Sequence, residues 1–179
     1  MLKKELLNAR SIQILLHRLT CQLIENHGSL KNAVLIGLQP RGTFLAKRLQ
    51  EFLKQENIDA QLGSLDITFF RDDFRRRDNP LQPNQTKIDF LLEGKDVIFI
   101  DDVLYTGRSV RSALDAIQSF GRPRSVELLV LIDRRFSREL PIQPDYSGKR
   151  VDSLAGDRVA VEWKEENGNE DIVYILKAE

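Results

Sequence analysis

The sequence holds 179 residues, the length of a single domain. Hydrophobic residues make up 41% and charged residues 30%, which is typical of a folded globular protein and unlike a disordered chain. Lysine plus arginine and aspartate plus glutamate both number 27, so the formal net charge is zero. This balance excludes the strongly basic footprint of a general nucleic-acid binder but permits a local basic patch.

Cysteine and histidine are scarce. Cys21 is the single cysteine, so no internal disulfide can form, and we expect a cytoplasmic protein. Together with His17 and His27 it is too small a set for the usual zinc clusters. No apolar run approaches the ~20 residues that span a bilayer, and the N-terminus lacks the pattern of a signal peptide. We therefore expect no membrane partner.

The first predicted elements alternate between helices and strands. Apolar residues spaced i, i+3, i+4, i+7 predict a helix from about Ile12 that stops at Gly28. An unbroken apolar run predicts a buried strand at Ala33–Leu38, followed by a helix over about Thr43–Leu53. Ile67–Phe70 has strand composition.

A long polar stretch at about 71–87, with several charges and prolines, predicts a loop. A loop of this length inside a compact domain is either disordered or functional, often as a lid. After this loop we expect four strands, at Val97–Ile100, Val126–Ile132, Val159–Trp163 and Ile172–Leu176. Between the first two strands we expect a helix that has Val110, Ala113, Leu114 and Ile117 on one face and ends near Gly121.

Apolar strands that alternate with amphipathic helices predict βαβ units and a parallel sheet. The fold class is therefore α/β, with a small C-terminal appendage. No repeat, low-complexity tract or linker divides the chain, so we expect a single domain over residues 1–179.

Two adjacent carboxylates follow the strand predicted at Val97–Ile100. Asp101 and Asp102 stand at its carboxyl end, the edge where open α/β sheets place their ligands. The next turn, 106–109, leads into a helix whose N-terminal N–H groups and partial positive charge suit a phosphate. Gly107 permits a close approach of the backbone. Carboxylates repel phosphate but accept hydrogen bonds from sugar hydroxyls or bind Mg²⁺, so the pattern predicts a ribose 5-phosphate site.

Other interpretations were weighed against this one. The same residues also fit a helix capped by Ser109 beside two solvated aspartates. Neither G-x-x-x-x-G-K-[ST] nor G-x-G-x-x-G occurs, which excludes the usual nucleotide-binding loops. A second turn between strand and helix, from Gln39 to Gly42, carries Arg41 at a position suited to a leaving diphosphate, although such a turn is often only a turn.

The segment Val97–Ser109 resembles the 5-phosphoribosyl 1-diphosphate (PRPP) binding motif of type I phosphoribosyltransferases. Asp66–Asp73, the Val-Leu-Tyr-Thr-Gly-Arg loop at 103–108 and Arg138–Ile142 resemble the PyrR family, which joins uracil phosphoribosyltransferase activity to attenuation of pyrimidine operons. The resemblance runs over essentially the whole chain. It implies the type I phosphoribosyltransferase fold: a central, mostly parallel sheet flanked by helices, a small C-terminal hood at about 134–179 and a flexible catalytic loop at about 71–87.

The resemblance also implies the reaction: transfer of phosphoribose from PRPP to uracil, giving UMP and diphosphate. Mg²⁺ would arrive with the substrate and not be bound directly by the protein. The catalytic residues would be Asp101, Asp102 and Arg41. The residues implied in binding PRPP or UMP are Pro40, Arg41, Gly42, Asp101, Asp102, Val103, Leu104, Tyr105, Thr106, Gly107, Arg108 and Ser109.

Two further regions follow from the same resemblance. The flexible loop, with Arg71 and Asp72, would close over the site and exclude water. The base would lie near Arg134 and the backbone around Val159 and Val161. The family usually has threonine at the position of Pro40, and proline removes one backbone N–H donor there.

The family's second activity is binding of leader RNA from pyrimidine operons, which needs a basic surface. The first helix offers His17 and Arg18, but carries Cys21 and Asn26 where RNA-binding members tend to have histidine and arginine. Lys149 is a later candidate. Because RNA affinity depends on neutralising phosphates, losing two or three contacts weakens it strongly.

We therefore predict an enzyme with weakened or absent attenuation. The alternative is an RNA-binding regulator that senses UMP or UTP through a vestigial site. The resemblance also suggests a homodimer or a higher homo-oligomer.

Overall fold

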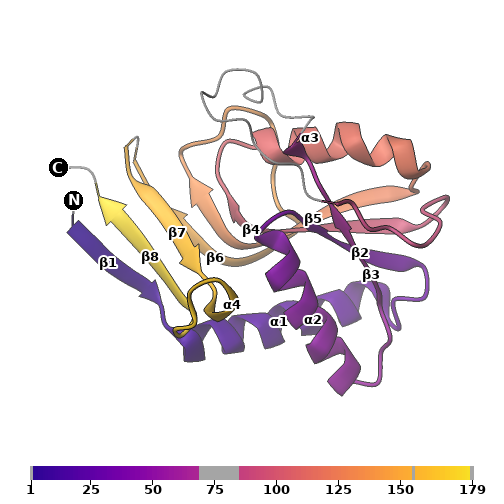
Figure 1. Cartoon of the computed structure of the whole chain (residues 1–179), viewed down its shortest axis with the longest axis horizontal. Helices are drawn as coiled ribbons and strands as arrows, with labels where there is room; N and C mark the ends of the chain where they lie inside the picture. Colours follow the sequence, from indigo (N-terminus) through magenta and orange to yellow (C-terminus); the bar gives the residue numbers. More distant parts are fainter. Residues whose placement is uncertain (1, 69–84, 155, 178–179) are drawn as a thin grey trace.

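The computed structural model describes residues 2–68, 85–154 and 156–177. Helices and strands alternate along most of the chain (Figure 1). The elements are β1 (Leu2–Leu7), α1 (Ala9–His27), β2 (Ala33–Leu38), α2 (Gly42–Gln55), β3 (Gln61–Leu65), β4 (Asp96–Leu104), α3 (Arg108–Ile117), η2 (Gln118–Phe120), β5 (Ser125–Arg135), β6 (Tyr146–Asp152), β7 (Arg158–Glu162), α4 (Lys164–Asn167) and β8 (Ile172–Lys177).

Five strands form one parallel sheet in the order β3-β2-β4-β5-β6. All six residues of β2 and the first five of β4 are buried, because helices cover both faces of the sheet. This confirms the predicted α/β class with a central parallel sheet flanked by helices.

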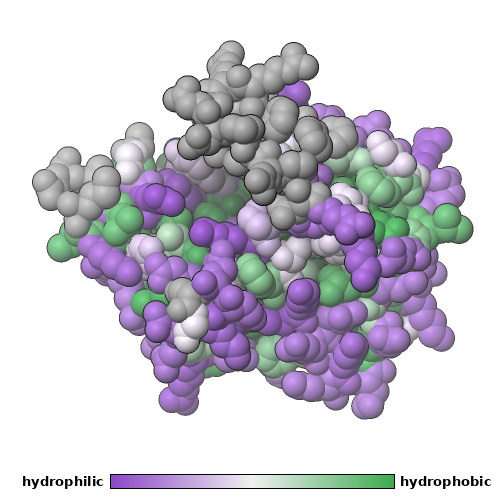
Figure 2. Space-filling model, viewed as in Figure 1, coloured by the Kyte–Doolittle hydropathy of each residue, from purple (hydrophilic) through white to green (hydrophobic). Residues whose placement is uncertain are grey.

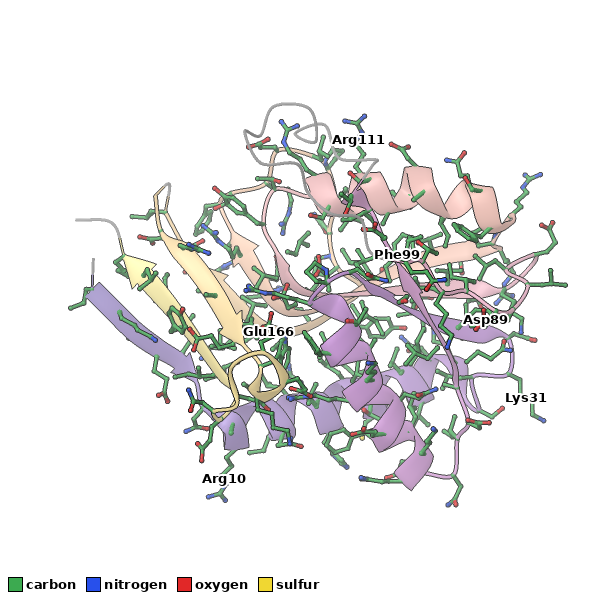
Figure 3. The ribbon with its side chains drawn as sticks, in the orientation of Figure 1. Arg10, Lys31, Asp89, Phe99, Arg111 and Glu166 are labelled. Carbon is green, nitrogen blue, oxygen red and sulfur yellow. The ribbon has the colours of Figure 1, made fainter. Side chains whose placement is uncertain are left out.

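The two faces of the sheet pack against different helices (Figure 1). Ile98 and Ile100 of β4 join the core shared with α1 and α2, whereas Val97 and Phe99 join the core beneath α3. Figure 3 shows Phe99 between the sheet and α3. Since neighbouring residues of a strand point to opposite faces, one continuous apolar run supplies both cores.

Both ends of α1 follow ordinary capping chemistry. The Asn8 side chain accepts a hydrogen bond from the Ser11 N–H at 2.9 Å. Gly28 ends the helix with a φ of 58°, and its N–H donates to the Ile24 carbonyl at 2.8 Å. The predicted stop at Gly28 is therefore confirmed.

Three antiparallel strands form a smaller sheet in the order β1-β8-β7. Its Val161 and Val173, with the fully buried Trp163, join the core under α1 and α2. The predicted small C-terminal hood at about 134–179 and this sheet do not have the same members. The strand β1 comes from the N-terminus, and β6 pairs with β5 in the large sheet. The first four residues of β1 are exposed, so no apolar pattern announces that strand.

Two local predictions also need correction. The strand that pairs in parallel with β2 here is β3, at Gln61–Leu65, and not a strand that begins at Ile67. Ile67 and Thr68 follow that strand, and Phe69 and Phe70 lie outside the described residues. Leu114, expected on one face with Val110, Ala113 and Ile117, is 36% exposed, whereas those three residues are buried.

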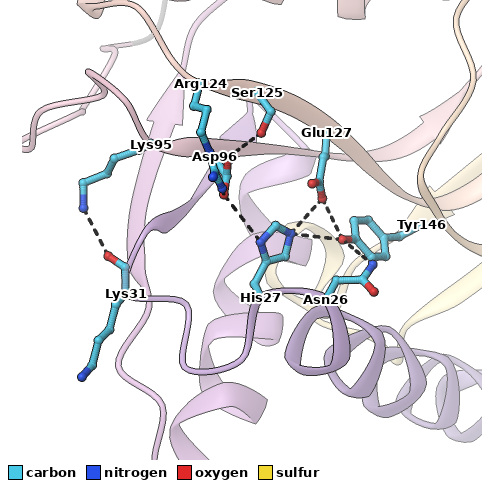
Figure 4. A network of polar contacts seen from close by, with 9 residues as sticks. All are labelled: Asn26, His27, Lys31, Lys95, Asp96, Arg124, Ser125, Glu127 and Tyr146. Carbon is cyan, nitrogen blue, oxygen red and sulfur yellow. Dashed lines mark hydrogen bonds and ion pairs between the residues drawn. The ribbon is translucent and has the colours of Figure 1, made fainter.

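A polar network joins the end of α1 to the amino ends of β4, β5 and β6 (Figure 4). His27 Nε2 lies 2.9 Å from Glu127 Oε2, which also accepts from the Tyr146 hydroxyl at 2.7 Å. Asp96 accepts from Arg124 Nε at 2.8 Å, and its other oxygen lies 3.9 Å from His27 Nδ1. Burial is the main reason that the pKa of Tyr146 is raised to about 12.

The face of the molecule in Figure 2 is mostly hydrophilic, with small hydrophobic patches between the charged groups. Among the described residues, none of the helices combines the length and apolar character needed to cross a membrane.

Candidate functional site

The aspartate pair lies inside β4, near its carboxyl end. This strand continues through Leu104, beyond the predicted end at residue 100, because its pairing with β5 extends as far as Leu104 and Asp133. Asp101 is half-buried and Asp102 is buried. The alternative of two solvated aspartates therefore does not describe this strand.

Burial raises the pKa of the Asp102 carboxyl. The positive charge of Arg41, a hydrogen bond involving Asp101 and one from the Val103 N–H at 2.8 Å all oppose this rise. The Asp102 N–H donates to Asp101 Oδ1 at 2.9 Å, so the two acids are linked through the backbone as well. Desolvation thus dominates at Asp102, and a ligand that donates hydrogen bonds or positive charge would stabilise its ionised form.

The turn Gln39–Gly42 brings the start of α2 against β4. A Cβ atom on Gly42 would lie 2.1 Å from the Ile100 carbonyl oxygen and 3.1 Å from Asp101 Cα, so only glycine permits this approach. Gly37 of β2 meets the α2 backbone in the same way, since its Cβ would lie 2.8 Å from a Cα atom of that helix. The two glycines set the start of α2 directly beside the aspartate pair.

Arg41 stands at the cap of α2, after a cis Gln39–Pro40 peptide bond. Its Nε lies 3.4 Å from Glu166 Oε1, and Figure 3 shows Glu166 close to the start of α2. Its charge also lowers the pKa of Asp102. Arg41 therefore lies between a carboxylate of α4 and the buried carboxyl of β4.

The chain turns from β4 into α3 at residues 105–107. Gly107 caps the helix with a φ of 92°, in the left-handed region that favours glycine. The Arg108 N–H at the start of α3 donates to the Thr106 hydroxyl at 3.3 Å, whereas Ser109 lies in the first turn of the helix and is not its cap. The first N–H groups of a helix have no partner within the helix, and together with the macrodipole they suit an anion.

The predicted loop residues Arg71 and Asp72 lie outside the described residues. The residues on both sides of that segment are held by hydrogen bonds beside the turn at Gln39. Gln39 Nε2 donates to the Gln85 carbonyl at 2.8 Å, and the Asp66 N–H donates at 3.0 Å to a threonine hydroxyl on the far flank. Both flanks thus begin next to the Arg41 turn.

Of the residues predicted to lie near the base, Arg134 is buried, and its guanidinium lies 3.9 Å from the centre of the Tyr105 ring. Its Nε donates to the Ser153 hydroxyl at 2.9 Å. Burial is the main reason that the pKa of Arg134 is lowered. The side chains of Val159 and Val161 are buried in the core, so at those positions only the backbone is available to a ligand.

The residues predicted for RNA binding have mixed surroundings. Arg18 donates to two backbone carbonyls of β6, and Lys149 Nζ donates to the Leu6 carbonyl at 3.1 Å. His17 is exposed, and its ring centroid lies 6.1 Å from that of Phe52. Arg18 and Lys149 are therefore engaged in contacts that join α1, β1 and β6.

Sequence reasoning missed the ion pairs that join α2 to the C-terminal segment around α4 and β8. The buried Arg48 donates to Asp171 Oδ1 at 2.9 Å and to Glu165 Oε2 at 2.7 Å, and its guanidinium lies 4.4 Å from the Trp163 ring centre. One signal was available, because Arg48 falls three residues after the buried Leu45, on the inward stripe of the helix. An arginine there requires buried acidic partners.

Comparison with known proteins agrees with this geometry. The model of the phosphoribosyl transferase domain matches residues 3–166. A protein of Enterococcus faecalis named Bifunctional protein pyrR is 42% identical over 172 residues, which cover 96% of each chain. The chain belongs to the PyrR family of phosphoribosyl transferases.

Other PyrR relatives match to a similar extent. Bifunctional protein PyrR of Limosilactobacillus fermentum is 43% identical over 94% of this chain and 95% of its own. The Pyrimidine operon regulatory protein of Lactococcus lactis subsp. lactis is 42% identical over 97% of each.

Solved structures show the fold. A hypoxanthine phosphoribosyltransferase from Staphylococcus aureus has a TM-score of 0.71 and 22% identity, covering 97% of this chain and 92% of its own. That of Trypanosoma cruzi has a TM-score of 0.73 and 15% identity, covering 98% and 97%. At such identities the likeness to these structures concerns the fold and leaves the choice of base open.

Proposed function

We propose that this protein transfers phosphoribose from PRPP to uracil, giving UMP and diphosphate. Its membership of the PyrR family and its relatives named as bifunctional proteins support this activity. The observation that carries the proposal is the meeting of three features at one edge of the sheet: the aspartate pair of β4, the Arg41 turn and the Gly107 turn into α3.

Each feature suits one part of PRPP. The backbone N–H groups at the start of α3 would bind the 5-phosphate. Asp101 and Asp102 would accept hydrogen bonds from the two ribose hydroxyls. Arg41 would bind the diphosphate, whose negative charge grows as it leaves the anomeric carbon. The reaction passes through a transition state with oxocarbenium character, so holding both ends of the sugar and neutralising the leaving group supply the catalysis.

The donor set at this edge fits Mg²⁺ carried by the substrate. Throughout the described ranges, no group of three or more histidine, cysteine or acidic side chains is placed to hold a metal ion. Mg²⁺ keeps several of its waters and is bound largely through substrate phosphates, so it would reach this edge with PRPP, beside Asp101 and Asp102, which accept hydrogen bonds from the ribose hydroxyls. When bound, the ion would neutralise charge on the diphosphate.

The base would lie beside the small sheet. We place it near Arg134 and the backbone of Val159 and Val161. These lie next to the turn at residues 105–107, called the phosphate turn below, because Arg134 contacts the Tyr105 ring of that turn. The loop with Arg71 and Asp72 would close over the site, since its flanks start beside Gln39.

The test is conversion of labelled uracil to UMP with PRPP and Mg²⁺. We expect turnover by the wild type and a loss of at least about 100-fold in kcat/KM for Asp102→Asn, since the ribose diol loses a charged acceptor. The matched control is Asp115→Asn, whose carboxylate is 50% exposed on α3, and it should retain wild-type rates. Absence of turnover in folded wild-type protein would refute the proposal.

We also propose a second function, binding of pyrimidine-operon leader RNA, because a relative at 42% identity is named as a regulatory protein of that operon. The affinity should be weak. Arg18 and Lys149 are engaged with backbone carbonyls, which leaves fewer cations for phosphates. A gel-shift titration with leader RNA, with and without UMP, tests this. Tight binding that depends on UMP would contradict the expected weakness.

A further inference from the structure

A short segment after β5 contacts the backbone of the phosphate turn. The Arg138 guanidinium donates through Nη1 to the Tyr105 carbonyl. The Glu139 and Leu140 N–H groups donate to the Thr106 carbonyl at 3.0 and 3.2 Å. Two successive carbonyls of the turn are therefore held by residues 138–140.

The planar peptide bond gives these contacts a consequence for the turn. In a trans peptide unit, the C=O and the following N–H point in opposite directions. Because the Tyr105 and Thr106 carbonyls both face residues 138–140, the N–H groups of Thr106 and Gly107 both point away from that segment. Successive N–H groups that point the same way form a concave anion site. The segment thus determines which way the turn presents its donors.

Arg138 is itself held in place by a buried acid. Its Nη2 donates to Asp133 Oδ1, and the Asp133 side chain is only 8% exposed. Arg150 of β6 approaches the other oxygen of Asp133, with its Nε at 3.8 Å, and its side chain is 68% exposed. Arg138 therefore joins the end of β5 to the phosphate turn. Arg150 contacts the same acid, but among the described residues it has no hydrogen bond to Tyr105.

We propose that Arg138 is a positioning residue for the 5-phosphate. It fixes the Tyr105–Thr106 peptide so that its N–H faces the phosphate, and Glu139 and Leu140 do the same for the next peptide. This rests on the proposed function, because it takes the turn before α3 as the phosphate site. Arg138 acts through the backbone, and Asp133 holds its guanidinium in the required orientation.

The experiment compares binding of ribose 5-phosphate and of inorganic diphosphate by calorimetry, in wild type, Arg138→Gln, Arg138→Lys and Arg150→Gln. For R138Q we expect the Kd for ribose 5-phosphate to rise about tenfold, the scale of one charge-assisted hydrogen bond, with the Kd for diphosphate unchanged. R138K keeps the charge but cannot span both acceptors, so its Kd should lie between. R150Q should bind as the wild type does.

The same variants are then assayed with PRPP and uracil. We expect R138Q to raise the KM for PRPP while kcat stays within about twofold, since binding is lost without a change at the reacting atoms. Thermal unfolding reports whether each variant is folded. If R138Q does not fold, the comparison of R138K with the wild type carries the test.

Several outcomes would overturn the inference. Unchanged ribose 5-phosphate binding in R138Q, or in R138K where that variant carries the test, would remove the positioning role while leaving the proposed function intact. Equal weakening in R150Q would assign the effect to general positive charge, and equal weakening for diphosphate would assign it to structure alone. Wild-type protein that binds ribose 5-phosphate more tightly than R138Q but turns over no PRPP would retain the inference and refute the transferase. Wild-type protein that does not bind ribose 5-phosphate would overturn both.

Discussion

The carboxylate of Asp96, at the amino end of β4, gives a pH-dependent contribution to stability that can be calculated. Hydrogen bonding to Arg124 is the largest cause that lowers its pKa, from 3.8 to about 2, with smaller contributions from Ser125 and from the charge of His27. Burial acts in the opposite direction. Asp96 Oδ1 accepts from Arg124 Nε at 2.8 Å and from the Ser125 hydroxyl at 2.6 Å, as Figure 4 shows.

The shift converts into a free energy of unfolding. Lowering the pKa of Asp96 from 3.8 to about 2 corresponds to roughly 2.4 kcal/mol, at ~1.36 kcal/mol per pKa unit. The Arg124 side chain is 68% exposed, so water screens part of this interaction. We therefore expect Asp96→Asn to lower the free energy of unfolding at pH 7 by about 1–2 kcal/mol.

The sign of the pH dependence follows from the direction of the shift. The pKa of Asp96 is lower in the folded than in the unfolded chain, so its contribution is complete above the unfolded value of 3.8 and is lost as pH falls through about 2. Urea unfolding of wild type and D96N between pH 7 and pH 2.5 measures it. The difference between them should be constant down to about pH 5 and shrink below that, because the unfolded chain then begins to take up protons.

A matched control separates the charge network from charge in general. Asp89 is 76% exposed and lies 4.0 Å from Lys87, so Asp89→Asn should change stability by less than about 0.5 kcal/mol. A D96N deficit that stays constant from pH 7 to pH 2.5 would refute the electrostatic account and assign the loss to packing. A D96N protein as stable as the wild type would refute the network's contribution altogether.

Three further predictions concern the site. Asp102→Asn should raise the melting temperature while it lowers activity, because burial raises the pKa of Asp102 and a neutral side chain avoids that penalty at pH 7; calorimetry measures it. Arg41→Gln should raise the KM for PRPP and move the acidic limb of kcat/KM to higher pH, since the charge that lowers the pKa of Asp102 is gone; a pH–rate profile measures both. Gly42→Ala should destabilise the protein by at least about 1–3 kcal/mol, because its Cβ would lie 2.1 Å from the Ile100 carbonyl oxygen; urea unfolding measures it.

The central sheet was predictable from the sequence because its strands are covered on both faces. Ala33–Leu38 and Val97–Ile100 are unbroken apolar runs that are buried along their whole length, which is typical of a parallel strand covered on both faces. Strand β1 was not predictable, because most of its residues are exposed and its pairing with β8 joins the two ends of the chain. Local pattern carries no information about a partner so far away in sequence.

The site was predictable in part. Asp101, Asp102 and Gly107 carry local signals, since a carboxylate after a buried strand and a glycine before a helix each need a reason. The contact of Gly42 with Ile100 depends on how two βα units pack. The hydrogen bond from Arg138 to the Tyr105 carbonyl joins residues 33 positions apart, so no local pattern predicts it. In the sequence, Arg138 is one basic residue among several, and only the fold distinguishes it from a solvated charge.

The two ends of β4 use the same side chain in opposite ways. At the amino end, Asp96 has an arginine and a serine within hydrogen-bond distance, and its pKa falls. Near the carboxyl end, Asp102 is buried with too few partners to offset desolvation, and its pKa rises. Stability is gained where the partners of a charge outweigh its desolvation, whereas a charge whose partners do not outweigh it raises the energy of the folded protein. A ligand with hydroxyl groups and a cation relieves that energy when it binds, so the incomplete pairing at Asp102 favours binding at this edge of the sheet.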